Sequence, residues 1–206
     1  MAQGAADDTA LAERCGRITA REARAIGIQV GFGPVVDVNT EPFNPIISTR
    51  SYSDDPERVT RLAKAFVAGA RAEGMLCTLK HYPGHGGTTG DSHSELPVVN
   101  LPYEELVNVH VKPYANLLQD TTVPVDFIMT AHVWYPAFDS GTTAWPATLS
   151  TTAIYNILRK QLGYKGIVIT DAFGMTGLQN AAPTPQATVY ALKAGVDIIL
   201  NATEYC

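Results

Sequence analysis

The chain has 206 residues, of which 46% are apolar and 17% charged, the composition of an ordinary globular protein with enough residues for a substantial core. Its 15 basic and 20 acidic residues give a net charge of −5 without any basic cluster, which argues against a nucleic-acid partner. No apolar run approaches the roughly 20 residues of a membrane-spanning helix, so we expect no membrane association.

Helical and apolar strand-like segments alternate from the amino terminus onward. Residues 8–26 are predicted to form a helix, and residues 28–38 a strand that Gly and Pro interrupt. After a loop, residues 56–73 predict the clearest helix of the chain, which Pro56 opens and Gly74 ends. Its apolar residues recur at i, i+3, i+4 and i+7, the spacing of one buried helix face.

The middle of the chain continues this alternation. Residues 75–79 predict a short buried strand that leads into a loop rich in Gly over residues 80–93. Residues 102–119 predict a helix that bends near Pro113, because proline cannot donate to the helical hydrogen-bond ladder. Residues 127–132 predict the next strand.

The last third repeats the pattern twice. A helix that Ser150 caps and Gly163 ends precedes a predicted strand over residues 166–171. A short helix over residues 186–194 then precedes a last strand over residues 196–200.

Five continuous apolar strands that alternate with helices indicate an α/β fold with a parallel sheet covered by helices. A TIM-type (β/α) barrel has eight strands and about 250 residues, so we predict one incomplete barrel domain over residues 1–206. Five strands cannot close a barrel and leave an unpaired edge. A second copy of the chain, in a homodimer, is one way to cover that edge.

The amino terminus and the cysteines bear on the compartment. The first residues have neither the basic start nor the apolar core of a signal peptide. Cys15, Cys77 and Cys206 are odd in number and far apart, which predicts reduced thiols. We therefore expect a cytoplasmic protein, while a leader removed during maturation would leave the same sequence and keep a secreted or periplasmic location open.

Ionisable residues stand at the ends of two predicted strands. Lys80 and His81 follow the apolar run 75–79, and Asp171 ends the strand over 166–171. In an α/β barrel, side chains at the carboxyl ends of strands point into the active site. The alternatives are that Asp171 caps the turn after it, and that Lys80 pairs with a neighbouring acid such as Asp37.

Five motifs occur in one order along the chain: Gly-Pro-Val-Val-Asp-Val-Asn at 33–39, Asn-Pro-Ile-Ile-Ser-Thr-Arg-Ser-Tyr at 44–52, Lys-His-Tyr-Pro-Gly-His-Gly at 80–86, Asp-Ser-His at 91–93 and Thr-Asp-Ala-Phe-Gly-Met at 170–175. Together they resemble the N-terminal barrel domain of family 3 glycoside hydrolases, in the bacterial β-N-acetylglucosaminidase branch. Members of that family carry further strands before the segment that matches residue 8, one with an Asp-Gln-Glu-Gly-Gly-like motif that holds the sugar. No such motif occurs in this sequence, so we expect a chain truncated at its amino terminus.

The resemblance implies a retaining mechanism in which Asp171 is the nucleophile and forms a covalent glycosyl-enzyme. It also implies that His93 is the general acid and base, with Asp91 as its partner. A histidine suits this role because its usual pKa lies near neutrality, and a nearby carboxylate fixes its tautomer and stabilises its charged form. The Asp-x-His spacing on a loop allows the two side chains to meet, and closure of that loop over substrate is expected.

The resemblance further implies that Lys80, His81 and Arg50 bind sugar hydroxyls and that Met175 packs at the pocket edge. Arg50 is equally compatible with a solvated loop residue, and Met175 with a core methionine.

The other histidines have structural interpretations: His85 bonds the loop backbone, His132 ends a strand and lines the site, and His110 packs within a helix. A metal site that uses His81, His85, Asp91 and His93 is the competing interpretation, but Pro83 and the glycines do not favour the helix that His-x-x-x-His spacing needs.

The sequence thus predicts a retaining exo-β-N-acetylglucosaminidase that acts on terminal N-acetylglucosamine of peptidoglycan or chitin fragments and needs no cofactor. One alternative is a β-glucosidase of the same family, although such enzymes generally take their acid/base from a second domain. Another is a weakly active or non-catalytic sugar-binding fragment that must oligomerise. Phosphorolysis is a third possibility, because a histidine acid/base tolerates an anionic acceptor better than a carboxylate does.

Overall fold

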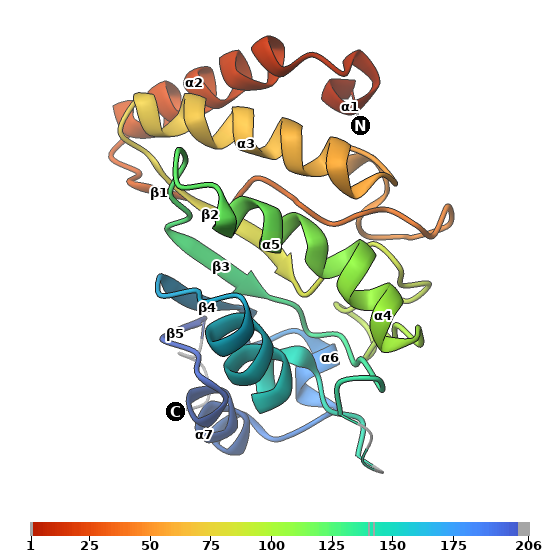
Figure 1. The fold of residues 1–206 in the computed structure, drawn as a ribbon. Helices are drawn as coiled ribbons and strands as arrows, with labels where there is room; N and C mark the ends of the chain where they lie inside the picture. Colours follow the sequence, from red (N-terminus) through yellow and green to blue (C-terminus); the bar gives the residue numbers. More distant parts are fainter. Residues whose placement is uncertain (1, 140, 142, 202–206) are drawn as a thin grey trace.

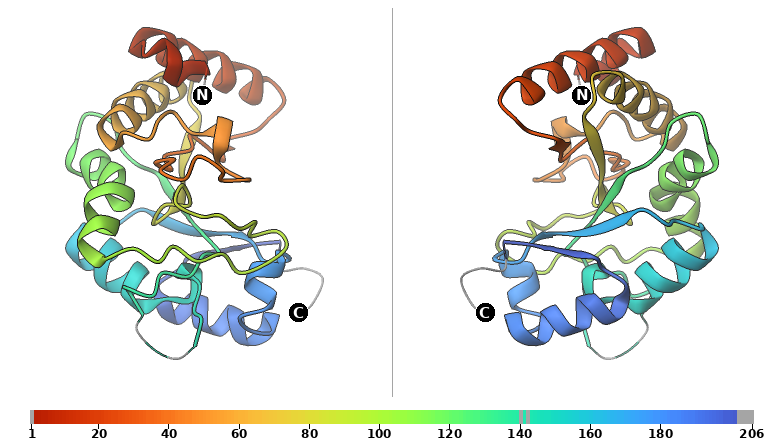
Figure 2. Two further views of the ribbon diagram at one scale, coloured as in Figure 1. Left: turned by 90° about the vertical axis from the view of Figure 1, so that its right-hand side faces the viewer. Right: turned by 90° about the vertical axis from the view of Figure 1, so that its left-hand side faces the viewer.

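A computed structural model describes residues 2–139, 141 and 143–201 of the chain. Its centre is one parallel five-stranded sheet in which strand order follows chain order. The strands are β1 (Val30–Gly31), β2 (Leu76–Tyr82), β3 (Phe127–Thr130), β4 (Ile167–Ala172) and β5 (Ile198–Leu200). Helices form an arc around the outside of this sheet, with α1 and α7 at its opposite ends (Figures 1 and 2). The predicted incomplete (β/α) barrel is confirmed as a half-barrel.

The α-helices begin and end close to the predicted positions where the sequence carries capping signals. The carboxylates of Asp8 and Asp55 each accept two backbone N–H groups in the first turn of their helices. The α-helices are α1 (Ala2–Ala6), α2 (Thr9–Ala25), α3 (Pro56–Ala72), α4 (Tyr103–Glu105), α5 (Lys112–Gln119), α6 (Thr176–Gln179) and α7 (Thr184–Ala194). Two turns are 3₁₀-helical, η1 (Ser48–Arg50) and η3 (Ala147–Leu149), and two segments are π-helical, η2 (Leu106–Val111) and η4 (Thr152–Gln161).

The predicted strand over residues 28–38 is wrong in extent. Only β1 and an isolated bridge between Val35 and Lys80 remain of it. Between these two pieces the carbonyls of Gly33 and Pro34 still accept the N–H groups of Thr78 and Lys80, but Pro34 has no N–H to donate, so the regular ladder is interrupted. The helices α1 and α6 were not predicted, because they are too short to show a clear apolar period.

The predicted bend near Pro113 takes the form of a change in helix type. The helix passes from α4 through the wider turns of η2 into α5, where Pro113 lies in the first turn. A π-helical segment before a proline accommodates the missing backbone donor. The helix that follows Ser150 is also π-helical, and the Ser150 hydroxyl accepts the N–H of Ala153 as predicted for a cap.

The strands alternate between a face that packs on the helices and a concave face. Cys77, Leu79, Ile128 and Val168 are buried in the core shared with the helices. Lys80, Met129 and Ile169 are paired in register and therefore point to the opposite, concave face. At the two edges of the sheet, Phe32 near β1 and Ile198 in β5 are 44% and 40% exposed.

Cys15 and Cys77 are free thiols, in agreement with the prediction, while Cys206 lies outside the described residues. Burial raises the pKa of Cys77 to about 12. Within residues 2–139, 141 and 143–201, none of the helices combines the length and the apolar character that a bilayer-spanning segment needs.

Candidate active site

Asp171 lies near the carboxyl end of β4, on the same face of the sheet as Lys80. Lys80 and Ile169 are both in register with Met129, and Asp171 follows Ile169 by two residues, one full period of a strand. Its side chain is 23% exposed. The sheet therefore presents a carboxylate and an ammonium group together on its concave face.

The two oxygens of Asp171 have different surroundings. Oδ1 accepts the N–H of Ala172 at 2.8 Å, which is the local turn contact that the alternative interpretation expected. Oδ2 faces the imidazole of His81, whose Nε2 is 3.9 Å away. One oxygen is thus held locally while the other points toward a ring from β2, two strands away.

The buried carboxylate of Asp37 bonds His81 on the side of the ring that faces away from Asp171. Asp37 is 0% exposed and its Oδ2 lies 2.8 Å from Nδ1 of His81. The same carboxylate accepts the backbone N–H of His81 at 3.1 Å and that of His85 at 2.7 Å. Burial alone would raise the pKa of Asp37, but His81 and His85 outweigh it and hold that pKa below its usual range.

Lys80 is half-buried. In the described part of the chain it makes no ion pair with Asp37, because the Asp37 carboxylate bonds His81 and His85 instead. Burial, and then the charge of Arg50, lower the pKa of Lys80, while Asp171 and Asp37 raise it in part. Arg50 ends η1 and is exposed, with its guanidinium donating to the carbonyl of Ile46 at 3.3 Å. The pairing of Lys80 with Asp37 that the sequence left open is therefore wrong.

The ring of His85 hydrogen-bonds two side chains of its own Gly-rich loop after β2 and so stabilises the loop from its buried side. This ring is buried, with Nδ1 2.9 Å from the Thr88 hydroxyl and Nε2 3.0 Å from the Ser92 hydroxyl. Burial lowers the pKa of His85 to about 4. The backbone carbonyl of Ser92 accepts the N–H of Gly177 in α6, so the loop also rests on the segment that follows Asp171. The structural role expected for His85 is confirmed, although it bonds side chains rather than backbone.

Asp91 and His93 form the pair that the Asp-x-His spacing predicts. Oδ1 of Asp91 lies 2.8 Å from Nδ1 of His93 and accepts the His93 backbone N–H at 2.7 Å. The backbone N–H of His93, and then its ring, hold the pKa of Asp91 below its usual range. The His93 side chain is 62% exposed, and neither a hydrogen bond nor an ion pair joins it to Asp171 in the described part of the chain.

Three further residues pack around the site or beneath its loop. His132 is buried behind Asp171, with Nε2 3.1 Å from the carbonyl of Ala172 and Nδ1 2.8 Å from the Thr148 hydroxyl, and burial lowers its pKa. Met175 is 8% exposed at the start of α6. His110 lies in η2 and is fully buried, so the packing role expected for it is confirmed.

The histidines and carboxylates do not gather as a metal site. Among the residues that the structure describes, no group of three or more His, Cys, Asp or Glu side chains is placed to share one ion. His81 and His85 bond Asp37, Thr88 and Ser92, while His93 sits outside with Asp91.

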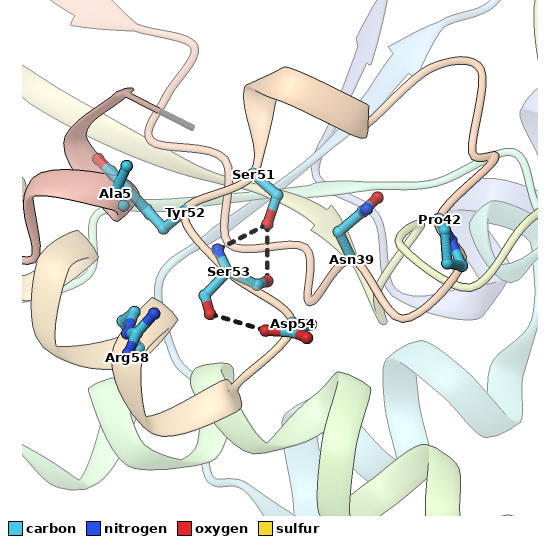
Figure 3. A pocket seen from close by; sticks show the side chains of 9 residues that line it. Ala5, Asn39, Pro42, Ser51, Tyr52, Ser53, Asp54 and Arg58 are labelled. Carbon is cyan, nitrogen blue, oxygen red and sulfur yellow. Dashed lines mark hydrogen bonds between the residues drawn. The ribbon is translucent and has the colours of Figure 1, made fainter.

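A pocket of about 450 Å³, drawn in Figure 3, has neither Asp171 nor His81 in its lining. It is lined by the 39–58 segment and α1, including Asn39, Ser51 and Arg58, and the Ser51 hydroxyl accepts the N–H of Ser53 within it. A second pocket of about 310 Å³ includes Arg50. Asp171 and His81 line neither, because they stand on the open concave face.

The structure thus brings Lys80, His81 and Asp171 together, with the Arg50 charge close to Lys80, and it forms the Asp91–His93 pair on an adjoining loop. Asp37 was not among the predicted site residues and was expected only as a partner for Lys80. The available signal was an acid directly after the apolar residues Val35 and Val36, the same signal that identified Asp171.

Comparisons with known proteins agree with this arrangement. The family model described as "Glycosyl hydrolase family 3 N terminal domain" matches residues 1–206. A β-hexosaminidase A of Pseudoalteromonas piscicida is 40% identical over 188 residues, which are 87% of this chain and 31% of the relative. A β-hexosaminidase of Idiomarina loihiensis is 37% identical, over 90% of this chain and 53% of the relative.

Solved structures show the same relation. A family 3 β-N-acetylglucosaminidase from Paenibacillus sp. str. FPU-7 superposes with a TM-score of 0.92 at 40% identity, over 97% of this chain and 37% of that one. A β-glucoside phosphorylase superposes with a TM-score of 0.90 at 32% identity, over 96% of this chain and 36% of that one. The chain spans about half the length, or less, of these proteins. Because the family model covers every residue and the half-barrel superposes on solved members, the chain belongs to glycosyl hydrolase family 3 and represents part of its N-terminal domain.

Proposed function

We propose that the chain carries the catalytic residues of a retaining exo-β-N-acetylglucosaminidase. The observation that supports this most directly is the approach of Asp171 Oδ2 to His81 Nε2 at 3.9 Å on the concave face, with Lys80 on the same face. A carboxylate beside hydroxyl-binding groups is what attack on a sugar ring requires. The β-hexosaminidase relatives favour an amino sugar as the substrate.

In the proposed reaction, an oxygen of Asp171 attacks the anomeric carbon and the glycosidic bond to the leaving oxygen breaks. His93 donates its proton to that oxygen, and Asp91 stabilises the ring in the orientation that allows this. Water then attacks the glycosyl-enzyme ester, with His93 now taking the proton. The free sugar leaves with its original anomeric configuration.

In the proposed reaction His93, whose side chain is exposed, must move toward the sugar. The loop is tied to α6 through the Ser92 carbonyl, directly after the segment that carries Asp171. This tie keeps the acid/base loop and the nucleophile on one side of the sheet. Closure of the loop over substrate would then bring the imidazole to the leaving oxygen.

The test is a panel of nitrophenyl glycosides of N-acetylglucosamine, glucose and xylose, assayed with the chain and with Asp171→Asn. We expect N-acetylglucosaminide to be the best substrate and Asp171→Asn to lose at least about a thousand-fold in turnover, since the nucleophile is gone. Asp126→Asn is the matched control, because Asp126 pairs with Arg71 and the Cys77 N–H at the amino-terminal ends of the strands. Full turnover by Asp171→Asn would remove Asp171 from the mechanism.

Phosphorolysis is a second candidate, favoured by the likeness to a β-glucoside phosphorylase. In that reaction phosphate rather than water attacks the glycosyl-enzyme, and the product is a sugar 1-phosphate. A histidine acid/base does not repel the phosphate anion as a carboxylate would. Turnover measured with and without phosphate, with the product identified by mass, separates the two reactions.

A further inference from the structure

We infer that Asp37 is a positioning residue for the reaction: it fixes the tautomer and orientation of His81, so that Nε2 of this ring faces the sugar beside Asp171. The inference deepens the proposed function and rests on it for its kinetic consequence. It concerns a residue that contacts no substrate itself and acts through the ring it holds.

The side chain of Asp37 is fully buried, and a buried carboxylate is costly unless it is paired and hydrogen-bonded. Three donors converge on it: the backbone N–H groups of His81 and His85 and the Nδ1 position of His81. Both oxygens are used, Oδ1 mainly by His85 and Oδ2 by the His81 ring.

The contact with Asp37 determines the tautomer of His81. An ionised carboxylate only accepts hydrogen bonds, and although burial raises the pKa of Asp37, His81 and His85 outweigh it and hold that pKa below its usual range. Nδ1 of His81 must therefore carry the proton in the 2.8 Å contact. When the ring is neutral, its lone pair is on Nε2, the atom that faces Asp171.

The carboxylate of Asp37 also fixes the orientation of His81. Because Nδ1 of the ring and the backbone N–H of His81 both bond this carboxylate, the residue is held at two points from one side. The ring of His85 packs edge-on against it, with centroids 5.9 Å apart. Nε2 is thus presented to the concave face as a hydroxyl acceptor, or as a donor when the ring is charged.

The alternative is that Asp37 only anchors the turn between Lys80 and His85. A purely structural anchor would affect stability and would leave the tautomer of His81 undetermined. Asp37→Asn distinguishes the two roles. The asparagine keeps the size of the side chain but offers an NH₂ group that can donate to Nδ1, which favours the opposite tautomer of His81.

The experiment combines nitrogen-15 NMR of the histidine rings with kinetics. In the unaltered chain we expect Nδ1 of His81, assigned by its loss in His81→Gln, to be protonated in every charge state. An unprotonated Nδ1 would overturn the inference, and this measurement on the unaltered chain does not depend on enzymatic activity. An inactive chain with a protonated Nδ1 would count against the proposed function only.

The kinetic arm is a double-mutant cycle. We expect Asp37→Asn to reduce kcat/KM about 10- to 100-fold, by analogy with the loss on removing a carboxylate that orients a metal-ligating histidine. In the His81→Gln background the same change should cost less than about 3-fold, because the ring it acts through is gone. Equal losses in both backgrounds would show that Asp37 is only an anchor. Asp126→Asn, a carboxylate at the other end of the strands, is the control for the charge change.

Discussion

His110 is the residue whose replacement tests the energetics of this fold most sharply. It is 0% exposed, and neither of its ring nitrogens has a hydrogen-bond partner among the described residues. The ring packs beneath the Gly-rich loop, since a Cβ added to Gly87 would lie 3.2 Å from both Cε1 and Nε2 of His110. Burial lowers the pKa of His110 to about 4. We expect His110→Leu to stabilise the chain.

The size of the effect depends on pH. At pH 7 the imidazole is neutral, and replacing an unpartnered polar group by an apolar one of similar volume should gain on the order of 1 kcal/mol. Below the unfolded pKa of about 6.5 the unfolded chain binds a proton at His110 that the folded chain does not, so stability falls as pH falls toward 4. At pH 5 this term reaches about 2 kcal/mol, and leucine abolishes it.

The assay is urea unfolding at pH 7 and pH 5, followed by circular dichroism, for the unaltered chain, His110→Leu and His110→Gln. The advantage of the leucine variant should grow by about 2 kcal/mol from pH 7 to pH 5. His85 and His132, whose pKa values burial also lowers, contribute equally to all three proteins. Glutamine does not titrate, so the stability of His110→Gln relative to the unaltered chain should also rise from pH 7 to pH 5. Because glutamine stays polar, this variant should show no gain at pH 7. A leucine variant that is less stable at pH 7, or an advantage that does not grow, would refute the reasoning.

Three further outcomes are expected. Gly177→Ala should lower stability by about 1–3 kcal/mol and reduce turnover, because the added Cβ would lie 2.5 Å from the Glu95 carbonyl oxygen and displace the loop that carries His93. Thermal melts measure the loss of stability, and Gly174→Ala is the control because open space surrounds that position. His93→Gln should reduce turnover of alkyl N-acetylglucosaminides far more than of nitrophenyl ones, whose leaving group departs without a proton, and equal losses would contradict its role as acid. Light scattering should give the mass of a dimer, since both sheet edges are open, and a monomeric mass at all concentrations would count against this association.

The sequence was most informative where one residue type decides local structure. Asp8 and Asp55 cap helices that begin where the sequence predicts, and the apolar runs ending at Lys80 and Asp171 are strands with ionisable residues at their carboxyl ends. These signals are local, because caps and apolar runs depend on neighbours within a few residues. They were sufficient to predict the half-barrel and to place Lys80, His81 and Asp171 at strand ends. The roles expected for these residues, and for Asp91 and His93, came from the family resemblance and remain predictions.

The rest depends on contacts between distant segments. Asp37 and His81 are 44 positions apart, and no local pattern states that this acid would accept from the ring. The short extent of β1 depends on which donors Pro34 removes from the ladder with β2. The π-helical form of η4 has no physical account in its sequence, which reads as an ordinary α-helix.

Each strand of the sheet pairs only with its neighbours in the chain, from β1 through β5. No segment has to thread between two that are already paired, so every βα unit can dock as soon as the one before it has formed. Growth or loss of units at either border leaves all interior pairings unchanged. An architecture assembled in this additive way can vary in length across evolution while the interior strand that carries Lys80 and His81 keeps its partners.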